Sequence, residues 1–189
     1  NWLFTWSRNM LDNQATKYYK NIETPPNLLY DYQSQESENK LRIDRNFKVK
    51  DYQFSAGTNV NFAKYTNNST VKQVNQNAID FDQISSELNL IQYGLYLQSA
   101  KNFFDNKVQI SLGARIDGSN YSDVMNNPFE QVSPRFSLNY KFAENWAFNF
   151  NTGIYYQLPA YTSLGFSLNN NLQNKNTLKY IKNSHLVAG

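Results

Sequence analysis

The chain has 189 residues, a formal net charge of +3 and no cysteine, which excludes a disulfide scaffold, thiolate chemistry and cysteine-based zinc sites. No run approaches the roughly 18 consecutive apolar residues of a membrane helix, and the scattered basic residues do not indicate a nucleic-acid-binding surface. Yet 14 Tyr, 13 Phe and 3 Trp are too many for a disordered chain. These side chains must cover something apolar.

Alternation of apolar and polar residues predicts strands along the whole chain. The N-terminal strand places Trp2, Phe4 and Trp6 on one side. Between Val108 and Ile116 the alternation has no exception, which is the period of two that a strand with two different faces requires. The last candidate has the least clear pattern. The eight candidate strands are 2–10, 41–47, 52–62, 91–97, 108–116, 132–142, 146–158 and 178–187.

The connections between these strands alternate strictly between short and long. Short turns are expected at 49–50, 104–107 and 143–145, and long polar loops at roughly 11–38, 65–88, 118–131 and 159–176. Membrane barrels have tight turns at one end and long loops at the other, whereas soluble sandwiches have short hairpin loops at both ends. The pattern favours a membrane barrel. A water-soluble β-sheet stays open, because alternation is common to both.

Two runs of the sequence resemble the β-barrel of TonB-dependent outer-membrane receptors. The first is YGLYLQSAKNFFDNKVQISLGARID (93–117), and the second is SPRFSLNYKFAENWAFNFNTGIYYQLPAYTSL (133–164). The family order is Y-x-Q, a short turn, G-x-R-x-D, a loop, S-P-R-x-x-x-x-Y, a turn, and a strand that ends in an aromatic residue and Pro. The matching residues are Tyr96, Gln98, Gly113, Arg115, Asp117, Ser133, Pro134, Arg135, Tyr140, Tyr155, Tyr156 and Pro159. The resemblance covers about 41–189.

The resemblance implies an all-β fold, namely an antiparallel up-and-down transmembrane β-barrel segment. Residues 1–189 would form about eight strands of one larger barrel of about 22 strands, as a fragment with two open edges and no plug domain. It implies the barrel wall and outer vestibule of a bacterial outer-membrane receptor that imports a scarce nutrient. The implied partners are outer-membrane lipid, the receptor's own plug domain, the TonB complex, and an unknown small-molecule, glycan or peptide substrate.

Two faces of the predicted strands would have different roles. Arg115, Asp117 and Arg135 fall on the polar face, so they would meet lumen water or, as the resemblance implies, the plug; pairing across strands with Arg135 or Lys141 is the alternative. The opposite face would contact lipid. The lipid-facing residues are Ile110, Leu112, Phe136, Leu138, Phe148 and Phe150.

Aromatic residues of the long loops could stack on a ligand while neighbouring Asn and Gln side chains bind its polar groups, although packing on each other is an equally good explanation. These residues are Tyr65, Phe81, Tyr121, Phe129, Tyr161 and Phe166.

Nothing in the sequence predicts catalysis, a metal or a cofactor. The one histidine, His185, excludes a His-paired metal site, and Glu36 with Glu38 lacks the ligand spacing of a calcium loop. Two other interpretations remain. One is a self-contained eight-stranded outer-membrane barrel with a structural or adhesive role, in which 2–10 pairs with 178–187. The other is a soluble β-barrel or sandwich that binds a ligand.

Overall fold

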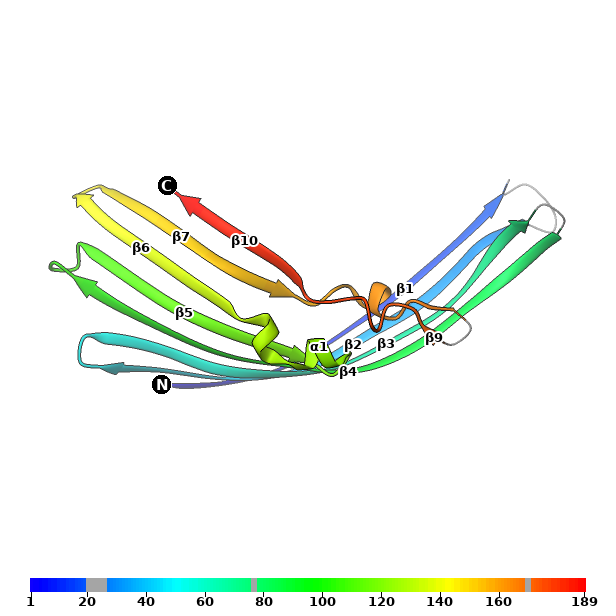
Figure 1. The fold of residues 1–189 in the computed structure, drawn as a ribbon, viewed down its shortest axis with the longest axis horizontal. Coiled ribbons are helices and arrows are strands. Elements are labelled where there is room, and N and C mark those ends of the chain that lie inside the picture. The colour runs from blue at the N-terminus through cyan, green and yellow to red at the C-terminus, as the bar shows by residue number, and fades with distance from the viewer. Residues whose placement is uncertain (20–26, 76–77, 169–170) are drawn as a thin grey trace.

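The computed structural model describes residues 1–19, 27–75, 78–168 and 171–189, and for residues 27, 73–75 and 78–81 it describes the backbone alone. Eight of the described strands form one antiparallel sheet in which each strand pairs with its neighbour in sequence. The sheet is curled like part of a barrel wall (Figure 1). The strands are β1 Trp2–Tyr19, β2 Asn27–Val49, β3 Tyr52–Asn75, β4 Ala78–Phe103, β5 Val108–Ser119, β6 Ser133–Ala143, β7 Trp146–Gln157 and β10 Ile181–Ala188. The all-β, up-and-down fold is confirmed, while the total of about 22 strands stays a prediction.

The three predicted short turns are confirmed, and they lie at one end of the sheet together with both termini (Figure 1). In the turn between β4 and β5, Phe104, Asp105 and Asn106 have positive φ angles of 53°, 51° and 66°. Lys107 N donates a hydrogen bond of 3.0 Å to Phe104 O and closes this turn. A left-handed backbone at three successive residues lets the chain reverse within four positions.

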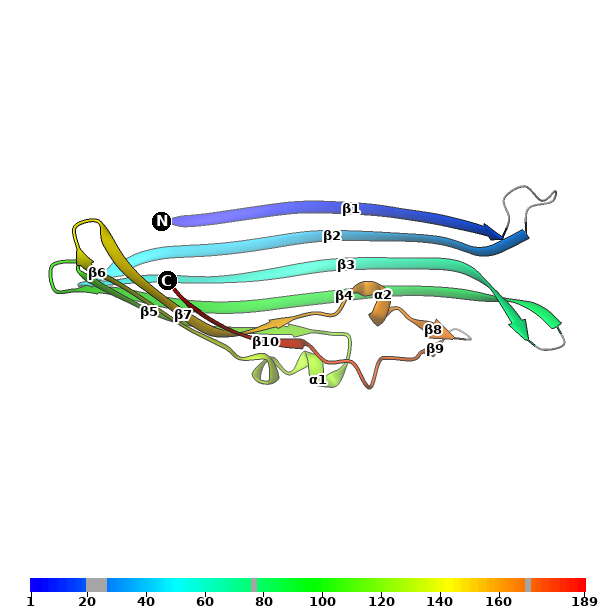
Figure 2. The same cartoon turned by 90° about the horizontal axis from the view of Figure 1, so that it is seen from above.

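The predicted loops at 11–38 and 65–88 are wrong, because most of these residues continue the strands. β2, β3 and β4 contain 23, 24 and 26 residues, far more than the roughly 9–11 that cross a bilayer. The four longest strands run side by side beyond the shorter ones (Figure 2). A strand with polar surroundings on both faces needs no alternation, so the hydrogen-bonded ladder continues where the sequence pattern ends.

The outward face of the sheet is mostly apolar over a limited height. Paired residues form rows across it, such as Phe54 of β3, Ser99 of β4, Leu112 of β5 and Phe136 of β6. On β4 this belt extends from residue 103 to Ile91, roughly 40 Å of strand at ~3.4 Å per residue. A tilt of about 40° reduces this to roughly 30 Å, the thickness of the hydrocarbon core. We call this band the apolar belt.

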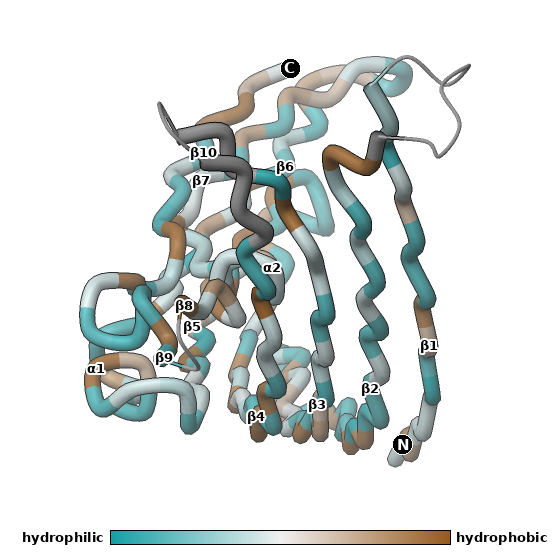
Figure 3. The backbone as a smooth tube through the Cα atoms, turned by 90° about the vertical axis from the view of Figure 1, so that its right-hand side faces the viewer, coloured by the Kyte–Doolittle hydropathy of each residue, from teal (hydrophilic) through white to brown (hydrophobic). Residues whose placement is uncertain are grey.

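Beyond Ile91 the outward residues of β4 become polar, beginning with Asn89 and Glu87. Figure 3, which views the end with the long connections, shows mostly polar residues along the outer halves of β1 to β3. The sequence therefore changes character where the strands would leave the lipid.

The remaining elements are short, and they connect the ends of the shorter strands. The connection from β5 to β6 holds the helix α1 Asp123–Asn126 and the 3-10 helix η1 Pro128–Gln131. The connection from β7 to β10 holds the helix α2 Tyr161–Leu164 and a hairpin of β8 Ser167–Leu168 with β9 Asn171–Leu172. Irregular chain at 118–131 and 159–176 is thus largely as predicted. None of the described helices has the length and hydropathy needed to span a bilayer.

A small core lies on the inner face of the eight-stranded sheet, beyond the apolar belt. Residues 158–168 and 171–180, here named the inner segment, lie over the concave side of the sheet (Figure 1). Leu158, Tyr161, Leu164, Leu172, Leu178 and Tyr180 of this segment pack against residues of β3 and β4. The sequence pattern gave no sign of this core, because Tyr65 and Leu88 fall in the predicted loop at 65–88 and Ala63 and Leu90 lie just outside the predicted strands. Its buried residues are Ala63, Tyr65, Leu88, Leu90, Tyr121, Met125 and Leu164.

The described sheet does not close on itself. β1 and β10 are its two edge strands, and no pairing joins them. This contradicts the self-contained eight-stranded barrel, which requires 2–10 to pair with 178–187.

Candidate functional site

The inner face of the wall carries a cluster of charged side chains at the height of the apolar belt. Arg115 Nε donates hydrogen bonds to both carboxylate oxygens of Asp117, at 2.9 and 2.8 Å. Its Nη2 donates to Asp117 Oδ1 at 2.6 Å and to Asn59 Oδ1 at 2.8 Å. The cluster links β5 to β3 across β4, where Gly94 lies between them; a Cβ at Gly94 would lie 2.5 Å from Arg115 Nη2. Glycine provides the space for this ion pair.

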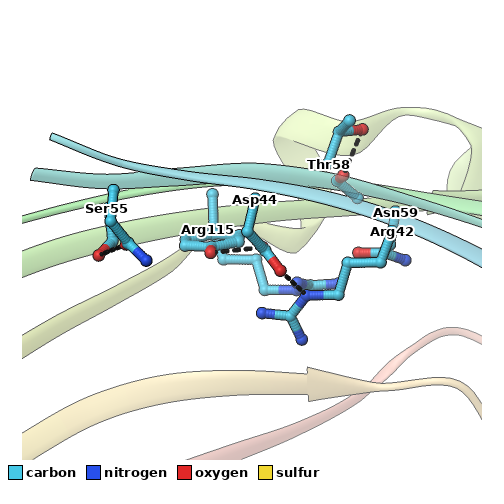
Figure 4. Close-up of polar contacts among 9 residues, drawn as sticks. Arg42, Asp44, Ser55, Thr58, Asn59 and Arg115 are labelled. Atoms are coloured by element: carbon cyan, nitrogen blue, oxygen red, sulfur yellow. Dashed lines mark hydrogen bonds and ion pairs between the residues drawn. The ribbon is translucent and has the colours of Figure 1, made fainter. Parts of the chain in front are cut away.

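A second cluster lies beside the first. Arg42 Nε donates to Asp44 Oδ2 at 2.7 Å, and Tyr96 OH donates to Asp44 Oδ1 at 2.6 Å. The Arg42 guanidinium also lies 5.7 Å from the centre of the Tyr96 ring. Gly57 stands between Asp44 and Tyr96, and a Cβ there would collide with both side chains. Arg42 and Arg115 extend from the sheet on the same side, opposite to Thr58 (Figure 4).

Arg135 lies on this inner face but joins neither cluster. Its guanidinium stacks 4.6 Å from the centre of the Tyr155 ring, and Tyr155 in turn contacts the His185 ring at 5.0 Å. Among the described residues, Asp117 forms its ion pair with Arg115 of its own strand. The alternative that Arg115 and Asp117 pair across strands with Arg135 or Lys141 is therefore wrong. Contact of these residues with a plug stays a prediction.

The six vestibule aromatics do not form one surface. Tyr65 belongs to β3 and not to a loop, and with Tyr121 it is buried, at 2 % and 3 % exposure. Phe81 also belongs to a strand, β4, with its side chain outside the described residues. Phe129 on η1 is 78 % exposed. Phe166 follows α2 and is partly exposed. The expectation of loop positions is therefore wrong for Tyr65 and Phe81, because these segments continue the ladder.

Tyr161 of the same set anchors the inner segment to the wall. Its hydroxyl donates to Glu38 Oε1 at 2.6 Å and accepts from Gln92 Nε2 at 2.8 Å. Asn61 Nδ2 donates to the same carboxylate oxygen at 3.1 Å, and Lys40 Nζ lies 2.6 Å from Glu38 Oε2. Residues 123 positions apart are joined by this contact.

The surroundings of this anchor determine the protonation of Tyr161 and Glu38. Burial, and then the bond to Glu38, raises the pKa of the Tyr161 hydroxyl, which therefore stays a donor. Burial acts to raise the pKa of Glu38, but hydrogen bonds from Lys40, Tyr161 and Asn61 lower it overall. Because this pKa is lowered, Glu38, which lies on β2 beyond the apolar belt, is a carboxylate at neutral pH.

The six residues expected to face lipid occupy paired rows of β5, β6 and β7. Ile110 pairs with Leu138 and Leu112 with Phe136, on the face opposite to Arg115. Leu112 is 58 % exposed, and the Phe136 and Phe150 rings lie 6.1 Å apart. The position of Phe148 opposite Tyr140 completes the same surface. Contact with lipid itself stays a prediction.

Sequence reasoning missed the residues that build the clusters from β2 to β4. Charged residues at every second position of β2, Lys40, Arg42 and Asp44, were a usable signal, since the residues between them are apolar. The roles of Gly57 and Gly94 had no such signal, because the crowding comes from strands far away in sequence. In the part of the chain that the structure describes, no three His, Cys, Asp or Glu residues gather as a metal site.

Residues 1–183 match the family model described as TonB dependent receptor-like, beta-barrel. The chain therefore belongs to this family, whose barrels are outer-membrane receptors that function with a plug domain and TonB in the full protein. The match begins at residue 1, about 40 residues before the resemblance noted in the sequence, and so includes β1. No curated protein matches the chain.

Proposed function

We propose that this chain forms the barrel wall and part of the outer vestibule of a transporter that takes up a scarce nutrient across the outer membrane of a Gram-negative bacterium. In this role it is a scaffold and not an enzyme. The TonB complex would supply the energy through a part of the receptor outside this sequence. Outer-membrane lipid would contact the apolar belt.

The observation that carries the proposal is the difference between the two faces at one height. Leu112 and Phe136 lie outward in the apolar belt, while the clusters of Arg115 on β5 and Arg42 on β2 lie inward on the same sheet. Charged side chains at membrane depth are costly unless they face water or protein. An aqueous or protein-filled lumen behind the wall satisfies this condition, as a transporter barrel with a plug does.

The inward clusters would form the contact with the plug. Arg115 and Asp117 are both partly exposed, at 25 % and 15 % of their side chains, although they pair with each other. An ion pair that is held by Asn59 and partly open can add further hydrogen bonds to another domain with little loss of side-chain entropy.

Transport is tested in a strain that lacks the intact receptor. Growth is compared with the parent on ferric siderophores, cobalamin, oligosaccharides and peptides as limiting nutrients, and complementation is repeated without TonB. We expect a defect on one nutrient that the receptor rescues only when TonB is present. Growth equal to the parent on every nutrient, or rescue without TonB, would refute the proposal.

Plug contact is tested separately by ion conductance of the intact receptor in planar bilayers. Replacing both Arg115 and Asp117 with Ala should raise the frequency of open events, because the plug loses its partners on the wall. The control is Ser137→Ala, on the inner face of β6 away from the clusters. Identical conductance of the double variant and the control would contradict the contact.

A further inference from the structure

An open groove of about 850 Å³ crosses β1 to β4 at one height, on the inner face of the sheet and beyond the apolar belt. Three successive residues from each strand line it, namely 12–14 of β1, 33–35 of β2, 66–68 of β3 and 85–87 of β4. Ser167 and Leu172, of the β8–β9 hairpin, line it at the β4 end. Strands about 4.8 Å apart give it a length of roughly 14 Å from β1 to β4.

The lining is almost entirely uncharged and polar. Of its fourteen residues, eleven are Ser, Thr, Asn or Gln, one is Leu, and none is Lys or Arg. The two acidic residues point to the outward face, where both are engaged. Asp12 Oδ1 accepts from Gln35 Nε2 at 2.7 Å, and Glu87 Oε1 lies 2.8 Å from Lys64 Nζ. Because the hairpin residues lie on the inner face, the strand side chains that face the groove are Asn13, Ser34, Asn67 and Ser86. The groove thus offers neutral donors and acceptors and no free cation for an anionic ligand.

Two of the lining hydroxyls lack the partners that buried polar groups usually have. Ser34 Oγ and Ser86 Oγ are shielded from water and make no hydrogen bond within the described residues, and Ser34 as a whole is only 7 % exposed. A buried hydroxyl without a partner costs free energy. Such groups are expected where a ligand completes the bonding. Asn67 between them accepts from Ser69 Oγ at 2.6 Å through its Oδ1.

The groove also adjoins the inner segment. It lies four to six positions beyond Ile91 on β4, outside the apolar belt. Ser167 Oγ donates to Ser85 O at 2.6 Å, so the hairpin that lines its end is attached directly to the wall. Leu172 of the same hairpin packs against the inner core. A ligand held here would touch the inner segment, which lies on the inner face of the wall.

We propose that this groove binds a free neutral oligosaccharide as cargo. The inference rests on the proposed transport function and names its substrate class. Sugar hydroxyls are both donors and acceptors, as are the hydroxyl and amide groups that line the groove, and a length of roughly 14 Å suits a short oligosaccharide. Ferric catecholates and phosphorylated ligands carry negative charge, for which this lining provides no partner.

Binding is measured by calorimetry with the intact receptor in detergent. The probes are cellotetraose, xylotetraose and maltotetraose, with a ferric catecholate as the anionic comparison. The test variant replaces Asn13 and Asn67 with Ala; these lining residues lie in the inward row with Ser34 and Ser86. The control replaces Gln33 and Asn68 with Ala; these residues pair with each other at the same height, on the opposite face of the sheet. Folding of each variant is checked by heat-modified migration in gels.

We expect at least one neutral tetrasaccharide to bind to the unchanged receptor. The test variant should bind it about tenfold more weakly, because two lost hydrogen bonds at ~0.7 kcal/mol each amount to a factor of ten. The control should match the unchanged receptor. Binding of the catecholate alone, or equal binding by the test variant, would overturn the proposal. So would binding only to vesicles that contain lipopolysaccharide, which would assign the groove to membrane glycolipid. Oligosaccharide binding without TonB-dependent uptake rejects the transport function instead, so the two failures are distinguishable.

Discussion

Replacement of Leu112 by Arg should block assembly of the barrel. Leu112 lies on the outward face of β5, where it pairs with Ser99 and Phe136, and more than half of its side chain is exposed. Between Val108 and Ile116 it is the central residue of the apolar run of this strand. In the membrane orientation inferred above, the new guanidinium would lie in hydrocarbon.

The magnitude follows from the depth of the residue. Four residues separate Leu112 from each end of the run, which is roughly 10 Å along the membrane normal at ~3.4 Å per residue and a tilt of about 40°. This places the residue near the midplane, where an Arg costs about 2–4 kcal/mol. The ratio of folded to unfolded barrel should fall by roughly 30- to 700-fold relative to the unchanged protein.

The assay is a urea titration of the intact receptor refolded into lipid vesicles, together with the yield of folded protein in the outer membrane. Ser111→Arg is the matched control, because Ser111 lies one residue away on the inner face, where its hydroxyl accepts from Gln98 Nε2 at 2.8 Å. That variant loses one hydrogen bond, worth about 1 kcal/mol. Equal folded yields for the two variants would refute the assignment of the faces.

Three further predictions concern the inner face. Gly94→Ala should lower the free energy of unfolding in the urea titration by ~1–3 kcal/mol, because its Cβ would displace Arg115. Gly113→Ala, with 3.5 Å to its nearest neighbour, should change this free energy little, and equal effects would contradict the crowding. Tyr161→Phe removes the hydroxyl that binds Glu38 and should release the inner segment to limited proteolysis, at a cost of ~1–2 kcal/mol; unchanged cleavage would argue against the anchor. Because the pKa of Glu38 is lowered on folding, its stabilisation is complete above the ordinary value of 4.5 and disappears as the pH falls through the folded pKa. Cleavage by pepsin should therefore increase in that acid range, and less steeply in Tyr161→Phe.

The fold was predictable where one physical rule governs every residue. Lipid on one side and a wet lumen on the other impose a period of two, which is why the run from Val108 to Ile116 identified both faces of β5. The turn at 104–107 was equally predictable, since it interrupts two such runs. The same rule failed beyond the apolar belt. There Gln, Asn, Ser and Thr occupy both faces, and neither period nor hydropathy distinguishes a long ladder from a loop.

The candidate site was predictable only in part, for a related reason. Arg115 and Asp117 were conspicuous because they are the two charged residues of β5 and lie on its polar face. Their actual partner Asn59 is 56 residues from Arg115, and no local pattern reports it. Tyr65 and Tyr121 were expected as ligand contacts because they are aromatic residues in polar surroundings. They are buried instead, since the inner segment folds over them, and that tertiary contact has no signature in either local sequence.

The length of β2 to β4 limits how this receptor can diversify. Outside the apolar belt these strands are paired continuously, so inserting one residue within the ladder would turn every later side chain to the opposite face. Changes in length are therefore tolerable only at hairpin tips, while the walls between them can vary only by substitution. Antibodies, phages and toxins that target this protein should meet a surface whose chemistry drifts but whose backbone is conserved in shape.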